Sequence, residues 1–314
     1  MPPEHAAPWL APALAPMLAP MLAPMLALAL ASALTACAAP VSAPPLAGSG
    51  LQWIVGPADG GVPTRLIARV CRPPSAVAAP VAVINHGAPP RDGVAAMQPG
   101  RCDSEPAQWF LARGYLVVFA LRRGFGASTG PVVESSGPCD RPDYVHAGRE
   151  SARDVEAVVR FATTLPGTRP DGAVVLGQST GGWAVMAYAS LPHPPAAALV
   201  SMAGGRGGHA LGEPDSYCRP DLLVQAAGAL GATARDPMLW VSAQNDTYFD
   251  PGLAASMRDA FNAAGGHATL VEPPPFDGEG HLLFNGAGGS AVWGPILLRY
   301  LAGTMTVAEG DDGL

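Results

Sequence analysis

The sequence predicts an α/β domain in which a mostly parallel central sheet carries helices on both faces and begins with an antiparallel hairpin. Short apolar runs without strict alternation recur along the chain, which is typical of strands buried on both faces. Segments with helical periodicity separate these runs, and this alternation favours a parallel sheet. Hydrophobic residues make up 49% of the 314 residues and charged residues only 14%, so one domain can bury a large core.

The antiparallel hairpin is predicted at the start of the folded part. Residues 51–55 and 65–71 are runs with strand character, and Asp59, Gly60 and Gly61 lie between them as a turn signal. Two strands of the parallel part should follow directly.

The first parallel strands are predicted at residues 81–85 and 116–120. The first run ends in His86 and Gly87, and the helical stretch 105–113 lies between the two runs. This order of elements is that of a crossover unit joining neighbouring parallel strands.

A long amphipathic helix is predicted over residues 145–164. Val155, Val158 and Val159 recur with helical spacing, while Glu156 and Arg160 can pair on the outer face. The remaining elements alternate in the same way, with strands at 173–176, 196–202, 238–243 and 268–272 and helices at 181–190 and 253–264.

Three long segments follow strands and should lie where such sheets bind ligands, at the carboxyl ends of the strands: residues 88–104, 127–144 and 203–235. Aromatic residues that could line the pocket, or could equally serve local packing, are Tyr144, Trp183, Tyr217, Tyr248, Phe249 and Phe284.

The charge composition excludes several classes of function. A net charge of −7 offers no basic surface for nucleic acid. All 18 basic residues are arginine. A phosphate-binding Gly-Lys-Ser/Thr loop, a lysine Schiff base and a Ser-Lys dyad therefore cannot be built from this chain.

The N-terminus has features of an export signal of the lipoprotein type, with an atypical proline-rich start that carries no Lys or Arg. The apolar run 25–34 has the length of a signal-peptide core. The sequence Leu34-Thr35-Ala36-Cys37 resembles the lipobox of bacterial lipoproteins, which implies cleavage before Cys37 and lipidation of that residue. Plain secretion, or an apolar tail with a chance cysteine, are the alternatives.

The predicted organisation follows from these features. Residues 1–36 form the signal peptide, residues 37–50 a flexible tether rich in Ala, Pro, Ser and Gly, and residues 304–314 an acidic tail. The folded domain spans residues 51–303. A lipid on Cys37 would be its one link to a membrane in the bacterial periplasm or cell envelope.

The four cysteines besides Cys37 are an even number, which fits an oxidising compartment. At least one disulfide is expected, and Cys139 with Cys218 is favoured because both follow strands on the side of the expected pocket. Cys71 instead ends a strand that runs the other way. Four free thiols in a cytosolic protein are the alternative, and no spacing matches a metal site.

The strongest chemical motif is Gly177-Gln178-Ser179-Thr180-Gly181, which lies between a predicted strand and a predicted helix. A Gly-x-Ser-x-Gly sequence in this setting is typical of a nucleophile elbow, because the glycines let the strand and helix approach closely. Ser179 is therefore the candidate nucleophile.

A serine hydroxyl needs a base, and the base needs an orienting acid. Asp246 follows the strand at 238–243, and His281 follows the next strand, so the order is Ser, acid, His. Asp250 is the alternative acid. Because Pro251 follows it at the start of a helix, Asp250 is better suited to capping that helix.

The segment His86-Gly87-Ala88 follows the strand at 81–85 and is the candidate oxyanion-hole loop. A backbone N–H of Ala88 would act with that of Thr180 on the developing negative charge. His86 precedes the serine in the chain and is not expected to be the base.

The elbow, together with Arg122-Arg123-Gly124-Phe125-Gly126-Ala127-Ser128, resembles the α/β-hydrolase superfamily, in its dienelactone-hydrolase-like and prolyl-oligopeptidase-like branch. The resemblance covers roughly residues 51–302 and implies an α/β-hydrolase fold. Dienelactone hydrolases carry cysteine as nucleophile, so Ser179 argues against lactone specificity. Haloalkane dehalogenases and epoxide hydrolases use aspartate there, so their chemistry is also disfavoured.

The expected function is hydrolysis of a carboxylic ester by Ser179, His281 and Asp246, a mechanism that needs no cofactor and no metal. A peptidase or amidase is the nearest alternative, because the same triad cleaves amides once the leaving nitrogen is protonated. A catalytically silent surface protein on the same scaffold is the third, and the intact triad counts against it. The expected partner is a small ester or short peptide; the oligomeric state is left open.

Overall fold

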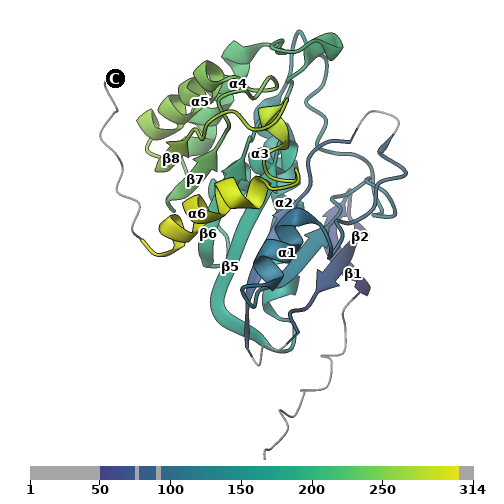
Figure 1. Ribbon diagram of the computed structural model, residues 1–314. Helices are drawn as coiled ribbons and strands as arrows, with labels where there is room; N and C mark the ends of the chain where they lie inside the picture. Colours follow the sequence, from purple (N-terminus) through teal and green to yellow (C-terminus); the bar gives the residue numbers. More distant parts are fainter. Residues whose placement is uncertain (1–49, 75–77, 90–92, 304–314) are drawn as a thin grey trace, which may run out of the picture. The chain divides into compact units, whose positions relative to one another are not determined.

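The computed structural model describes residues 50–74, 78–89 and 93–303. The predicted signal peptide with Cys37, nearly all of the tether and the acidic tail lie outside these residues. The described part contains one eight-stranded sheet with the strand order β1-β2-β4-β3-β5-β6-β7-β8 (Figure 1). The strands are β1 Gly50–Asp59, β2 Val62–Cys71, β3 Ala79–Asn85, β4 Leu116–Ala120, β5 Thr168–Gln178, β6 Ala196–Met202, β7 Met238–Val241 and β8 Ala268–Val271.

The sheet is antiparallel at one edge and parallel elsewhere. β1 and β2 form the hairpin, and β2 pairs antiparallel with β4. Each further pair, from β4 with β3 to β7 with β8, is parallel. The α/β-hydrolase fold with an antiparallel start, predicted from the sequence, is confirmed.

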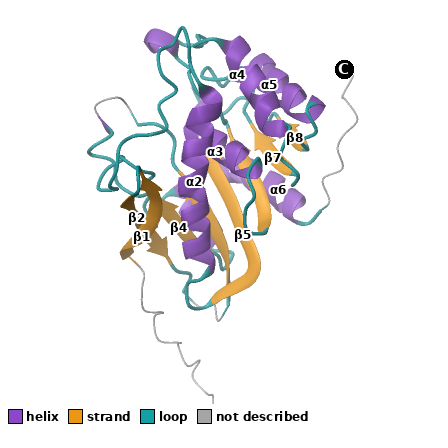
Figure 2. Cartoon of the chain, turned by 180° about the vertical axis from the view of Figure 1, so that it is seen from behind, coloured by secondary structure: helices purple, strands orange, loops and turns teal. Residues whose placement is uncertain are grey.

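Helices cover both faces of the sheet. α1 and α6 pack on one face around Trp293 (Figure 1). α2, α3, α4 and α5 pack on the other around a core that contains Trp183, and α2 and α3 lie in front in the reverse view (Figure 2). No helix of the described part is both long and apolar enough to cross a membrane. The helices are α1 Glu105–Leu111, α2 Tyr144–Thr163, α3 Thr180–Ala189, α4 Pro220–Gly231, α5 Pro251–Ala263 and α6 Gly289–Leu301.

α2 shows how the sequence pattern becomes structure. Val155, Val158 and Val159 are buried against the sheet, and the Glu156 carboxylate pairs with the Arg160 guanidinium at 2.7 Å on the outer face. The N-cap is Asp143, whose carboxylate accepts the backbone N–H of His146 at 2.8 Å. The cap satisfies one of the N–H groups that a helix leaves free at its start.

Two helices were not predicted from the sequence. α4 lies inside the segment 203–235, which was expected to be a loop, although Pro220 at its first turn and apolar residues at helical spacing mark it. α6 contains Pro295 in its interior, and proline usually ends a helix, so its pattern was hidden. Here packing overrides propensity, because Trp293 and Leu297 of α6 are fully buried.

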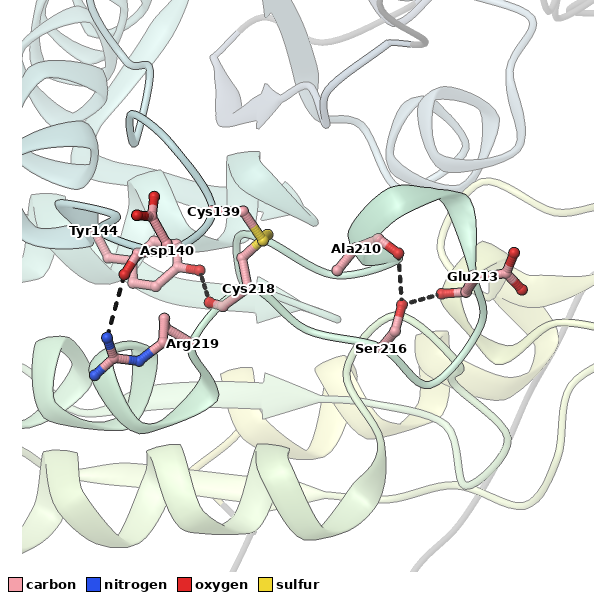
Figure 3. The surroundings of a disulfide bond; sticks show 8 residues. All are labelled: Cys139, Asp140, Tyr144, Ala210, Glu213, Ser216, Cys218 and Arg219. Atoms are coloured by element: carbon pink, nitrogen blue, oxygen red, sulfur yellow. Dashed lines mark hydrogen bonds between the residues drawn. A yellow bond between two sulfur atoms is a disulfide. The ribbon is translucent and has the colours of Figure 1, made fainter.

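The described cysteines form two disulfides, Cys139–Cys218 and Cys71–Cys102, with Cα atoms 4.8 and 5.6 Å apart. The first is the pair favoured from the sequence; it ties the segment before α2 to the segment before α4, and the Tyr144 hydroxyl donates to the Cys218 carbonyl beside it (Figure 3). The second was not favoured. The segment 93–104 passes Phe119 at Gly100 and so returns along β4 to the end of β2, where Cys71 lies.

Candidate active site

Ser179 lies in a sharp turn between β5, which ends at Gln178, and α3, which begins at Thr180. Its backbone has φ 58° and ψ −122°. A non-glycine residue at positive φ is strained, and such strain is concentrated at functional sites. The turn leaves the serine partly exposed at the carboxyl end of the sheet.

The two glycines of the motif are required by close packing. A Cβ at Gly177 would clash with the Gly181 carbonyl, and a Cβ at Gly181 would clash with the Asn85 carbonyl. The turn is also held by backbone bonds, since the Ser179 N–H donates to Met202 at 3.0 Å and its carbonyl accepts from Gly205 at 3.2 Å. The structure therefore forms the sharp, closely packed strand-turn-helix at Ser179 that the sequence motif predicts.

His281 and Asp246 are brought together by loops that follow β8 and β7. The His281 Nδ1 atom lies 3.1 and 3.2 Å from the two carboxylate oxygens of Asp246, and both side chains are buried. Because a carboxylate only accepts, Nδ1 carries the proton and Nε2 is left as the basic nitrogen. The His281 carbonyl accepts from the Gln178 amide at 3.0 Å, which ties the histidine loop to the residue before Ser179.

Asp246 and Asp250 have different partners. The Asp246 Oδ1 atom also accepts the backbone N–H groups of Tyr248 and Phe249, at 2.8 and 3.0 Å. Asp250 caps α5 by accepting the Leu253 N–H at 3.1 Å, and its other oxygen accepts the Tyr217 hydroxyl at 2.6 Å. Of these two carboxylates, Asp246 alone contacts the His281 side chain in the part of the chain that the structure describes.

The segment His86-Gly87-Ala88 lies against the elbow, as the oxyanion assignment requires. A Cβ at Gly87 would come 2.6 Å from the Gln178 side chain and 3.2 Å from the Ser179 Cβ. The His86 Nε2 atom accepts the Arg122 N–H at 3.2 Å, so Nδ1 carries the proton and donates to the Gly87 carbonyl at 2.8 Å. Burial, followed by the Arg122 charge, lowers the pKa of His86 to about 3, so this imidazole is neutral.

A cavity of about 260 Å³ lies beside Gly87 and Gln178. Its described lining holds no carboxylate, and its side chains are mainly apolar, among them Ile84, Met97, Phe119, Leu121 and Phe284. Of the aromatic candidates from the sequence, Phe284 therefore lines a cavity. Tyr144, Trp183 and Phe249 are buried in packing instead.

Glu279 was missed by sequence reasoning, and Tyr248 was named from the sequence only as a residue that could line the pocket. The Tyr248 ring stacks on His281 with centroids 4.1 Å apart, and the His209 ring stacks on the far side of Tyr248. Glu279 accepts the His281 N–H at 2.9 Å and the Thr247 N–H at 3.1 Å, so it joins the acid loop to the histidine loop. Burial raises the pKa of Glu279, but the hydrogen bond from the Thr247 hydroxyl and the two from the backbone N–H groups outweigh burial and hold it below its usual range.

A buried charge cluster of Arg122, Glu134 and Arg206 was also missed. Burial raises the pKa of Glu134, but the two guanidinium groups outweigh burial and hold it far below its usual range, so the carboxylate is ionised. The three residues are distant in the sequence and share no motif. Among the described residues, no group of three or more His, Cys, Asp or Glu side chains is arranged to hold a metal ion.

Comparison with known proteins places the chain in a family. The family model of the X-Pro dipeptidyl-peptidases (S15 family) matches residues 59–238, from β1 to the start of β7. No curated protein matches the chain.

Solved structures share the fold at low sequence identity. DcsB, solved in complex with its substrate analogue, has a TM-score of 0.54 and 15% identity over 81% of this chain and 99% of its own. Dipeptidyl peptidase 4 of Porphyromonas gingivalis has a TM-score of 0.52 and 13% identity over 81% of this chain but only 35% of its own. The 2,6-dihydroxy-pseudo-oxynicotine hydrolase has a TM-score of 0.51 and 16% identity over 85% and 72%. The chain is thus a hydrolase of the α/β-hydrolase superfamily, and because the family model matches more than half of it, it belongs to the X-Pro dipeptidyl-peptidase (S15) family.

Proposed function

We propose that the protein is a serine hydrolase that cleaves a carboxylic ester through an acyl-enzyme on Ser179. The observation that carries the proposal is the strained elbow at Ser179 beside the buried His281–Asp246 pair. Acyl transfer requires a nucleophile, a base that takes its proton and a group that orients the base, and a serine, an imidazole and a carboxylate can supply these three roles.

In the first half-reaction, Ser179 Oγ attacks the ester carbonyl carbon while His281 Nε2 takes its proton. Asp246 holds Nδ1–H and stabilises the imidazolium that forms. His281 then returns the proton to the leaving alkoxide oxygen as the carbon–oxygen bond breaks. In the second half-reaction, water attacks the acyl-enzyme with the same proton transfers, and Ser179 is released with the acid product.

Negative charge develops on the carbonyl oxygen in both tetrahedral intermediates. The backbone N–H groups of Thr180 and Ala88 are proposed to donate to it, one from the start of α3 and one from the loop after β3. The close approach of Gly87 to Ser179 supports this assignment, because any side chain at residue 87 would push the loop away.

We assign the cavity beside Gly87 and Gln178 to the acyl group of the substrate, and its mainly apolar described side chains suit a neutral acyl group better than the free amine of a peptide. An ammonium group would need a carboxylate partner when it is buried, and the described cavity lining has none. The buried Glu134 is not available, because Arg122 and Arg206 already occupy its oxygens. A peptidase is the second candidate, and the family match supports it.

A matched substrate panel tests the choice. Purified protein is assayed with p-nitrophenyl butyrate, Ala-Pro-p-nitroanilide and the N-acetylated form of that anilide, with Ser179→Ala as the control. We expect kcat/KM to be highest for the ester and both anilides to be poor substrates. Preferred cleavage of Ala-Pro-p-nitroanilide, lost on N-acetylation, would make the protein a dipeptidyl peptidase. Failure of a fluorophosphonate to label Ser179 would exclude both.

Export with a lipid at Cys37 is proposed from the lipobox-like sequence. The two disulfides support an oxidising compartment, because cytosolic thiols are kept reduced. Mass spectrometry of the mature N-terminus from the native host should find lipid-modified Cys37 as the first residue. An unmodified cysteine, or cleavage elsewhere, would contradict anchoring while leaving export possible.

A further inference from the structure

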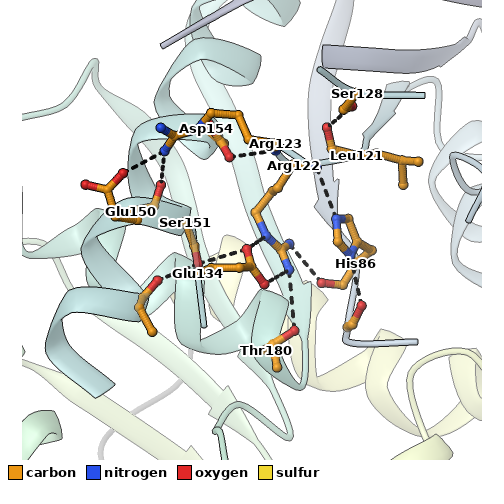
Figure 4. A network of polar contacts seen from close by, with 12 residues as sticks. His86, Leu121, Arg122, Arg123, Ser128, Glu134, Glu150, Ser151, Asp154 and Thr180 are labelled. Atoms are coloured by element: carbon orange, nitrogen blue, oxygen red, sulfur yellow. Dashed lines mark hydrogen bonds and ion pairs between the residues drawn. The ribbon is translucent and has the colours of Figure 1, made fainter. Parts of the chain in front are cut away.

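The Arg122 guanidinium lies at the centre of a buried cluster next to the elbow. Its Nη2 atom donates to the Glu134 carboxylate at 2.9 Å and its Nε atom donates to the other carboxylate oxygen (Figure 4). Arg206 donates to the same carboxylate at 3.0 Å and to the Glu134 carbonyl at 2.8 Å. The exposed fractions of Arg122, Glu134 and Arg206 are 2%, 4% and 7%, so no group of the cluster is free to reorient in solvent.

Arg122 contacts both segments that are proposed to supply the oxyanion hole. Its Nη1 atom donates to the His86 carbonyl at 2.9 Å, and its backbone N–H donates to the His86 ring at 3.2 Å. Its Nη2 atom lies 3.4 Å from the Thr180 hydroxyl. One planar group therefore spans the loop after β3 and the first residue of α3, which approach each other at Ser179.

We propose that Arg122 is a positioning residue that sets the distance between the two halves of the oxyanion hole and places a fixed positive charge behind them. The proposal rests on the proposed function, since it concerns the oxyanion that acyl transfer creates. Arg122 is not expected to touch the substrate.

The charge of the cluster is suited to this role. Two guanidinium groups face one carboxylate, and His86 adds no charge because its imidazole is neutral. The cluster therefore carries an excess positive charge in a region of low dielectric, where charges interact more strongly than in water. A lysine would keep the charge but could not make the forked contacts of a guanidinium, so charge and geometry can be separated by mutation.

Arg123 provides a matched control in the next residue. It is fully buried, and it also binds a carboxylate, donating to Asp154 at 2.7 Å and to Glu150 at 2.9 Å. Both partners lie on α2. Among its contacts in the described part, none is with His86 or Thr180, so Arg123 tests what loss of a buried ion pair does without the oxyanion segments.

The experiment compares Arg122→Lys with Arg123→Lys, using the ester substrate and a trifluoromethyl ketone that forms a tetrahedral adduct with the serine. For Arg122→Lys we expect kcat to fall on the order of 10²-fold, with KM nearly unchanged and inhibitor affinity reduced by a similar factor. Arg123→Lys should lower the melting temperature as much but leave kcat and inhibitor affinity near wild type.

Thr180→Val with Thr180→Ser as its control gives a second measurement if Arg122→Lys does not fold. Valine removes the hydroxyl contact with Arg122 and serine retains it. We expect Thr180→Val to lose more kcat and more inhibitor affinity than Thr180→Ser, with KM similar in the two variants.

Equal loss of kcat in the two arginine variants would overturn the proposal, as would an Arg122→Lys enzyme with normal kcat and inhibitor affinity. If Arg122→Lys does not fold, normal kcat in Thr180→Val would overturn it. The proposed function fails separately, if wild-type Ser179 is not labelled by the fluorophosphonate.

Discussion

Two adjacent arginines at the end of β4 enter two different regions of the molecule. The Arg122 side chain lies beside the turn at Ser179, and both Arg122 and Arg206 bind the Glu134 carboxylate. The Arg123 side chain instead binds Asp154 and Glu150 of α2. Figure 4 shows the two sets of contacts side by side. In one cluster two guanidinium groups bind one carboxylate, and in the other Arg123 binds two carboxylates, of which Glu150 also pairs with Arg153.

The pKa values of the two buried acids, Glu134 and Asp154, differ as the number of arginines around them predicts. Burial tends to raise the pKa of each, but the two arginines at Glu134 reverse the effect, while the single arginine at Asp154 does not, and the pKa of Asp154 rises to about 6. The same ion-pair chemistry can therefore serve either the proposed active site or the attachment of a helix. What decides is which backbone segments the guanidinium reaches.

Substitution of Asp246, in the loop after β7, should have the largest effect on turnover. Asp246→Asn should leave the fold intact but favour the wrong imidazole tautomer, with a loss on the order of 10⁴ in kcat, as in the serine-protease triad. Steady-state kinetics with the ester, beside a thermal melt, measure both effects. Near-normal turnover in Asp246→Asn would remove Asp246 from the catalytic assignment.

Removal of either disulfide should lower stability, but only one of the two removals should also lower turnover. Cys139→Ser with Cys218→Ser should cost about 4 kcal/mol of unfolding free energy, because the bond closes a loop with a separation of 79 residues. The Cys71–Cys102 bond closes a separation of 31 residues, so its double variant should lose slightly less. Only the first pair joins the segments that carry Glu134 and Arg206. Urea unfolding with parallel kinetics should therefore show a loss of kcat in that variant alone, and equal kcat in both would contradict it.

The pH dependence of stability should distinguish His86 from the scaffold groups. The pKa of His86 falls from 6.5 to about 3 on folding, so the unfolded chain binds more protons between these values and stability falls as pH falls. Between pH 6.5 and 4.5 this amounts to about 2 kcal/mol. Below pH 4.5, Glu134 adds a loss of the same sign.

His86→Gln can still accept the Arg122 N–H and removes this titration, so the difference between wild type and variant isolates His86. Asp154 acts in the opposite direction, because its raised pKa gives stability that is present below pH 3.8 and lost as pH rises through about 6. It is common to both proteins and cancels in the difference. Denaturant melts at several pH values measure the difference, and parallel curves would refute the neutral buried imidazole.

Asp250→Ala should have the smallest effect. Loss of the cap on α5 should cost about 1 kcal/mol, with kcat almost unchanged, because Asp250 binds Leu253 and Tyr217 rather than His281. The same melt and kinetics apply. A large loss of turnover in this variant would give Asp250 a role in the active site that its contacts do not suggest.

Local patterns made most of the fold predictable. The strand runs, the periodicity of α2 and the glycines around Ser179 each act within a few residues, so they can be found in the sequence. α6 was not predicted because Pro295 in its interior disfavours a helix, and only the burial of its side chains in the folded protein offsets this.

The sharp turn at Ser179 and the order in which Ser179, Asp246 and His281 follow their strands could be read from the sequence, because strand-turn-helix patterns are local. Three contacts could be seen only in the tertiary structure: Glu134 between Arg122 and Arg206, the stacking of Tyr248 on His281, and the disulfide between Cys71 and Cys102. These contacts join segments far apart in the chain. Their geometry depends on how the loops close over the carboxyl ends of the strands, and no spacing of residue types encodes that closure.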